Sequence, residues 1–255
     1  MAANDNVRMA WSWRIFGLGV AALGLIGFVW GDFVSGQPAP RWIPDRAALA
    51  YGAAAFMLIA GAAIEWRRTV AWAAAALIAY YGLIVLILEN GLVIAKNYAV
   101  YGAYYGAAEP LAIMAGALIV FCATADMDAA RARLLTRIAQ MAFGACAIFF
   151  GGAHFVYTNA TAPLIPKWLP PSQEFWAYAT GLFHIMAGVA VLAGVQARLA
   201  AILAAVMYAS FIPLVFAPVL MADPANAFRW TECAMTVVLI GVASTVADSL
   251  KRASP

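Results

Sequence analysis

The stretch LAAILAAVMYASFIPLVFAPVLM, Leu199–Met221, contains no charged residue. It exceeds the roughly 20 apolar residues that a helix needs to cross the hydrocarbon core of a bilayer. Similar runs recur along the whole chain of 255 residues, of which 66% are hydrophobic and 11% charged. Because globular domains carry about 25% charged residues, this composition indicates a polytopic protein embedded in a lipid bilayer.

Eight such apolar segments are separated by clusters of charge, proline, asparagine and aspartate. Backbone polar groups in lipid have to be paired within their own segment, so we expect each segment to be a helix. The predicted fold class is therefore an all-α membrane protein with eight transmembrane helices. The expected segments are residues 13–33, 46–64, 70–88, 105–123, 137–157, 173–195, 198–221 and 229–247.

The lysines and arginines are distributed unequally between the two ends of these segments. Ten of the 15 fall on one side, namely Arg8, Arg14, Arg67, Arg68, Arg131, Arg133, Arg137, Arg198, Lys251 and Arg252. The other five are Arg41, Arg46, Lys96, Lys167 and Arg229. Because positive charge is enriched on the cytoplasmic side, we predict a multi-pass protein of the bacterial inner membrane with both termini in the cytoplasm.

Short motifs in the first half of the chain recur in the second half. PRWIPD at Pro40–Asp45 matches PKWLPP at Pro166–Pro171, and AYGAAAFMLIAG at Ala50–Gly61 matches AYATGLFHIMAG at Ala177–Gly188. Such matches indicate an internal repeat. Since each half has an even number of spans, the two copies would share one orientation. We therefore predict two tandem parallel four-helix-bundle repeats, residues 1–125 and 126–255.

The same alignment pairs ionisable residues of the two halves. It sets Asp32 against His154, Met57 against His184 and Glu109 against Glu232. The second half thus has two histidines, which are the only histidines of the chain, where the first half has an aspartate and a methionine.

The stretch GGAHFVYTNATAPLIPKWLPPSQEFWAYATGLFHIMAGVAVL, Gly151–Leu192, resembles the DoxX-like integral membrane proteins. The resemblance lies in the order His-Phe, Pro-x-Trp-x-Pro and Thr-Gly; it covers most of the second half, and the first half resembles a degenerate copy. It implies a four-helix membrane unit. Some relatives are associated with quinone-coupled thiosulfate oxidation or with membrane complexes that respond to oxidative and thiol stress. His184 stands where family members often carry a glutamate.

His184 is the ionisable residue that we place deepest in the membrane. Gly181 and Gly188 share its helix face, so we expect it to point at a close neighbouring helix. Burying an ionisable group in a bilayer is costly and is by default a sign of function, although a neutral histidine bonded to a carbonyl is a common structural device. We place His154 nearer the outer surface, which disfavours a b-type haem held between the two rings. The pattern predicts no metal centre.

Acidic groups approach the same outer leaflet from several helices. The alternative to haem is therefore a proton relay, in which one or both histidines act beside a carboxylate at a quinone or small-molecule pocket. The candidate catalytic residues are His154, His184, Glu232 and Glu109. The candidate ligand-binding residues are Asp32, Arg229, Trp168 and Trp176.

Three classes of function remain open at this stage. The first is a redox-linked membrane subunit that handles quinone or thiol and sulfur chemistry with a membrane or periplasmic redox partner. The second is a proton-coupled small-molecule transporter, and the third is a non-catalytic scaffold of a larger complex. Sequence signals for phosphate loops, nucleic-acid binding and soluble catalytic triads are absent.

Overall fold

The computed structural model describes residues 10–251; Arg8 and Arg252, which contribute to the predicted orientation, lie outside the described residues. Within this part of the chain the secondary structure is entirely helical. Eight helical spans are long and apolar enough to cross a membrane, which confirms the predicted number and indicates a multi-pass membrane protein. They are α1 (Trp11–Trp30), α2 (Arg46–Ile64), α3–η1–α4 (Val70–Lys96), α5 (Tyr101–Thr124), α6 (Ala129–Val156), α8 (Gln173–Ala193), α9–η3–α10 (Ala197–Ala222) and α11 (Ala227–Lys251).

The fifth span differs most from its expected start. Helix α6 begins at Ala129 rather than near residue 137, and the Asp128 carboxylate caps it by accepting a hydrogen bond from the backbone N–H of Arg131 at 2.8 Å. An aspartate at this position satisfies one of the free N–H groups of a first turn. The apolar run marks only the part of α6 suited to lipid, and the helix continues beyond it through a basic segment.

Two spans change from α-helical to π-helical geometry partway along. The seventh span passes from α9 (Ala197–Phe211) through η3 (Ile212–Phe216) to α10 (Ala217–Ala222). Pro213 lies in η3 and lacks the N–H that a regular helix needs, so the regular helical hydrogen bonding is interrupted there. The third span has a longer π-helical segment, η1 (Tyr80–Asn90), between α3 (Val70–Ala79) and α4 (Gly91–Lys96). Nothing in the sequence of η1 predicts it.

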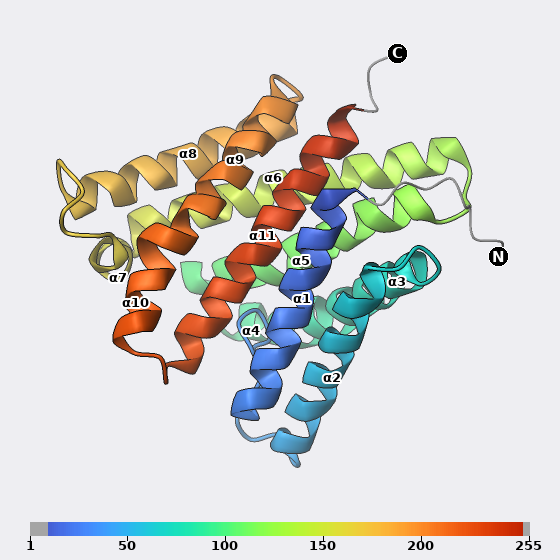
Figure 1. The fold of residues 1–255 in the computed structure, drawn as a ribbon, viewed down its shortest axis with the longest axis horizontal. Helices are drawn as coiled ribbons and strands as arrows, with labels where there is room; N and C mark the ends of the chain where they lie inside the picture. Colours follow the sequence, from blue (N-terminus) through green and yellow to red (C-terminus); the bar gives the residue numbers. More distant parts are fainter. Residues whose placement is uncertain (1–9, 252–255) are drawn as a thin grey trace.

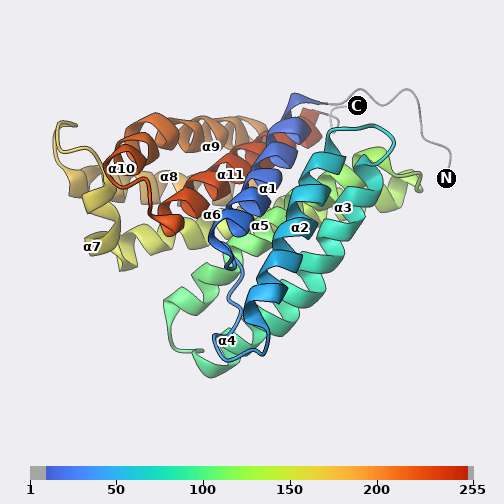
Figure 2. The same ribbon diagram turned by 60° about the horizontal axis from the view of Figure 1, so that its bottom comes forward.

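Helices α1 and α11 lie side by side in the middle of the molecule, with α8 and α9 on one flank and α2 and α3 on the other (Figures 1 and 2). The Ser12 hydroxyl at the start of α1 donates a hydrogen bond to Asp248 near the end of α11, at 2.9 Å. The two ends of the described chain therefore lie on the same side of the molecule.

Glycines allow two pairs of consecutive spans to cross closely. A Cβ atom added at Gly61 would strike the backbone of Gly17 across the α1–α2 crossing, and one added at Gly188 would strike Gly144 across the α6–α8 crossing. Small residues at such crossings let helix backbones approach within a membrane. The two crossings are related by the same shift along the chain, 127 residues (144 − 17 and 188 − 61).

Asp32 and His154, which the sequence comparison sets against each other, lie in different local structure. Asp32 lies beyond Gly31, whose left-handed backbone (φ +63°) caps the end of α1, whereas His154 lies inside α6. The correspondence of Asp32 with His154 stays a prediction.

Candidate functional site

A cavity of about 440 Å³ lies between α5, α6, α8, α11 and the seventh span. Five of the eight sequence-predicted site residues line it: His154, His184, Glu109, Glu232 and Arg229. Most of the remaining lining is apolar or aromatic, including Phe150, Phe211, Met235 and Leu239. Ionisable side chains from four helices therefore meet in a largely hydrophobic pocket.

The two histidines contact each other. Their ring centroids are 5.0 Å apart and the ring planes are inclined by 33°. In each ring Nδ1 lies 2.8 Å from the backbone carbonyl oxygen of the residue four positions earlier, Phe150 for His154 and Thr180 for His184. A carbonyl only accepts hydrogen bonds, so each Nδ1 carries a hydrogen and donates it. Nε2 is then the nitrogen of each ring that is free to accept or exchange a proton.

His184 is 3% exposed and faces a neighbouring helix, as its glycine-flanked position predicted. The expected offset between the two histidines does not keep their rings apart. Gly181, one turn before His184 on α8, lies directly against the Cβ of His154. Helix α8 continues about two turns beyond this level to its start at Gln173, and the end of α6 is followed by α7 (Thr158–Thr161), η2 (Ala162–Leu164) and the loop up to Ser172.

The two carboxyl groups are joined through a serine. The Ser35 hydroxyl oxygen lies 2.7 Å from Glu109 Oε2 and 2.7 Å from Glu232 Oε1. A hydroxyl has one hydrogen to donate, so it can satisfy only one carboxylate. The other carboxyl has to donate to the serine oxygen, which requires a proton on it. The Glu109–Ser35–Glu232 cluster is therefore arranged to hold a shared proton.

The side chains of Tyr208 and Arg229 also line the same cavity. The Tyr208 side chain packs against the His184 ring at 5.3 Å between centroids, and its buried hydroxyl has no hydrogen-bond partner among the described residues. A buried unpaired hydroxyl costs free energy that a bound ligand could recover. Arg229, at the start of α11, is half-buried, and its guanidinium lies over the Phe228 ring at 5.7 Å from the centroid. It places a positive charge at the edge of the cavity.

Three sequence-predicted ligand-binding residues lie elsewhere. Asp32 forms an exposed ion pair with Arg46. Trp168 is 71% exposed and does not line this cavity. Trp176 lines a separate apolar groove between α8 and α9, and its indole N–H donates to the Pro170 carbonyl at 2.8 Å. Asp32 and Trp168 are thus not part of the cavity.

Sequence reasoning missed Ser35 and Tyr208. Ser35 lies in the loop after α1, more than 70 positions before Glu109, and no local motif marks it. Tyr208 could have been found by the argument used for His184, since it is one of two hydroxyl-bearing side chains, with Ser210, in the middle of a charge-free segment.

A second cavity of about 420 Å³ lies on the other side of the carboxyl pair. Glu109, Glu232 and Tyr105 line both cavities, whereas Gln37 and Asn90 line only the second one. The Gln37 amide donates to the Tyr80 hydroxyl at 2.9 Å. The carboxyl pair therefore forms part of the wall between two cavities.

Within residues 10–251, the side chains of this site do not suit a haem held by both histidines or a metal ion held by three ligands. The histidine rings touch, so a porphyrin cannot lie between them with the iron held by both. Within residues 10–251, no three His, Cys, Asp or Glu side chains are grouped closely enough to hold a metal ion. The hydrogen-bonding groups instead suit a compact organic molecule that carries oxygen atoms.

A family model described as a domain of unknown function (DUF8561) matches residues 143–247. This part of the chain is therefore similar to that family. The matched range contains both histidines and Glu232, but it does not contain Ser35 or Glu109. No curated protein and no solved structure matches the chain.

Proposed function

We propose that this chain is a DoxX-like subunit of the bacterial inner membrane that binds a quinone-like molecule in the cavity lined by His154, His184, Glu109 and Glu232. The bound head group exchanges protons with these residues, and a membrane or periplasmic partner exchanges the electrons. One observation carries the proposal: ionisable side chains from four helices converge on a single, mainly apolar cavity. Burying such groups within a membrane is costly, and functional sites are where that cost is usually met.

The residues suit a head group whose oxygen atoms alternate between carbonyl and hydroxyl. Because Nδ1 keeps its hydrogen on a backbone carbonyl, Nε2 of either histidine accepts a hydrogen bond from a quinol hydroxyl, and it donates one to a quinone carbonyl once the ring is protonated. Tyr208 lines the cavity beside His184, and its hydroxyl has no partner among the described residues. Reduction of a quinone to a quinol takes up two electrons and two protons, and the carboxyl pair with Ser35 is a suitable source of protons.

The predicted membrane orientation and internal repeat belong to the same proposal. The basic start of α6 would lie in the cytoplasm with both termini, so the cavity, near the opposite end of α6, would lie in the outer half of the membrane. The common shift of 127 residues between the two glycine crossings (144 − 17 and 188 − 61) supports duplication of a four-helix unit.

The test replaces both histidines. Membranes that contain the His154→Ala, His184→Ala double variant are compared with wild type for quinone-dependent reduction and for binding of a quinone to the purified chain. We expect both to be lost, and glutamine at the two positions to restore part of the binding but no proton exchange. Unchanged binding and reduction in a double variant that folds normally would overturn the assignment.

Proton-coupled transport is the second candidate, because Glu109 and Glu232 lie between two cavities. A carboxyl pair that is loaded with a proton from one side and unloaded to the other would couple proton movement to uptake. Uptake driven by a pH gradient in proteoliposomes, abolished by Glu232→Gln, would favour this function over the first. Quinone binding without any such uptake would exclude it.

A further inference from the structure

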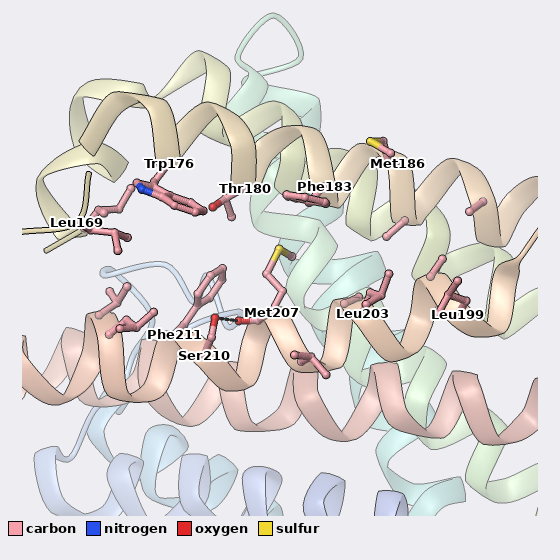
Figure 3. Close-up of a pocket in the computed structure, with 18 of the residues that line it drawn as sticks. Leu169, Trp176, Thr180, Phe183, Met186, Leu199, Leu203, Met207, Ser210 and Phe211 are labelled. Carbon is pink, nitrogen blue, oxygen red and sulfur yellow. Dashed lines mark hydrogen bonds between the residues drawn. The ribbon is translucent and has the colours of Figure 1, made fainter. Parts of the chain in front are cut away.

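An apolar groove of about 550 Å³ runs between α8 and α9 (Figure 3). It lies beside the cavity lined by the two histidines and the two glutamates, called the His–Glu cavity below. Trp176, Phe183 and Met186 of α8 face Leu203 and Met207 of α9 across it. The stretch from Leu199 to Phe211 covers roughly 18 Å at 1.5 Å per residue. The groove is therefore long enough to follow a large part of the hydrocarbon core, which is about 30 Å thick.

Small side chains create the hollow. Ala187 and Ala204 are 8% and 3% exposed and form part of its floor, whereas Leu203 at its rim is 54% exposed. Two of the polar side chains in its walls already have hydrogen-bond partners. The Ser210 hydroxyl donates to the Met207 carbonyl at 2.7 Å, and the Trp176 indole donates to Pro170. The groove thus offers hydrocarbon contacts and no free hydrogen-bonding group from these residues.

The groove adjoins the polar cavity. Ile165, Thr180, Phe211 and Val215 line both. The carbonyl oxygen of Thr180 accepts the hydrogen bond from His184 Nδ1, and the Phe211 ring lies 6.4 Å from the His184 ring. A molecule with its head beside His184 would therefore be separated from the groove only by side chains such as Thr180 and Phe211.

We propose that the α8–α9 groove holds the hydrocarbon tail of a ligand whose oxygen-bearing head group occupies the His–Glu cavity. This inference rests on the proposed function and narrows its ligand to tailed molecules that are dissolved in the bilayer and enter from the side. An untailed head group would bind the same cavity without contacting the groove. The tail moves from lipid hydrocarbon into the groove, so the affinity gained from it comes from close packing against the groove walls and not from apolar area withdrawn from water.

The test compares two probes with one head group, a benzoquinone that carries a decyl tail and the same benzoquinone with a methyl group in place of the tail. The full chain is reconstituted in lipid nanodiscs, and the affinities are expressed per concentration dissolved in the bilayer, so that simple partitioning cancels. We expect the decyl probe to bind about tenfold more tightly than the methyl probe. Leu203→Trp should fill the groove and remove this difference without changing the affinity for the methyl probe.

Leu182→Trp is the matched control, because Leu182 is a leucine of similar exposure (52%) on α8 that does not line the groove. It should leave both affinities unchanged. Equal affinities of the two probes for wild type, or a decyl affinity that Leu203→Trp does not change, would overturn the groove assignment and leave the head-group site standing. Failure of both probes to bind wild type would overturn the proposed function as well.

Discussion

Ser35 joins two acidic side chains that come from the first and second halves of the chain, so its replacement by alanine is a direct test of the cluster. The hydroxyl makes two hydrogen bonds of 2.7 Å, to Glu109 and to Glu232. If one acceptor is ionised and the other bond is neutral, their net contributions are about 1.5–3 and about 0.5–1.5 kcal/mol. Ser35→Ala should therefore lower the free energy of unfolding by about 2–4 kcal/mol.

The assay is reversible denaturant unfolding in mixed micelles. Ser35→Thr keeps the hydroxyl and should lose less than about 1 kcal/mol. Ser210→Ala is the control, since the Ser210 hydroxyl bonds only the carbonyl of Met207 in its own helix; we expect a loss of about 1 kcal/mol or less. Equal losses for Ser35→Ala and Ser210→Ala would refute the argument that one hydroxyl holds the carboxyl pair together. The loss should also shrink in a Glu109→Gln, Glu232→Gln background, because the amide groups can form only weaker, neutral hydrogen bonds with the serine hydroxyl.

Three further outcomes are expected. Tyr208→Phe should leave the free energy of unfolding equal or higher, because its buried hydroxyl has no partner within residues 10–251, yet weaken quinone binding by about fivefold to tenfold; undiminished binding would remove Tyr208 from the site. Asp32→Asn should change stability by no more than about 1 kcal/mol, since its pair with Arg46 is exposed, and a loss of quinone binding would contradict its placement outside the cavity. Gly188→Leu should cost about 1–3 kcal/mol by overpacking and should abolish binding, because the new side chain would push α8 away from α6; thermal unfolding and probe binding check both effects.

Much of the fold follows from the lengths of the apolar segments. A membrane helix satisfies its own backbone, so an uncharged run such as Leu199–Met221 has one stable conformation in lipid. The ends of the helices follow less well, because α6 continues into an arginine-rich segment that lipid does not constrain. The π-helical geometry of η1 depends on packing, and its residues carry no local signal for it.

Part of the site was predictable because placing ionisable groups in lipid is costly. Ionisable residues inside apolar runs are rare and tend to face the protein interior, which led to His184, His154, Glu109 and Glu232. The distances between these side chains were not predictable. Counting residues from the end of each helix does not show how the ends of different helices are offset from one another. The placement of Ser35 depends on the path of the loop after α1, to which hydrophobic periodicity does not apply.

The carboxyl cluster crosses the boundary between the first four spans and the last four. Ser35 and Glu109 come from the first four spans with their loops, and Glu232 and both histidines come from the last four. A chain cut between α5 and α6 would yield one fragment with the histidines and half of the acid pair, and another with the remaining acid and its bridging hydroxyl. The two halves are therefore mutually dependent: neither could be lost, or passed on alone to another protein, without dismantling the proton-holding centre that they build together.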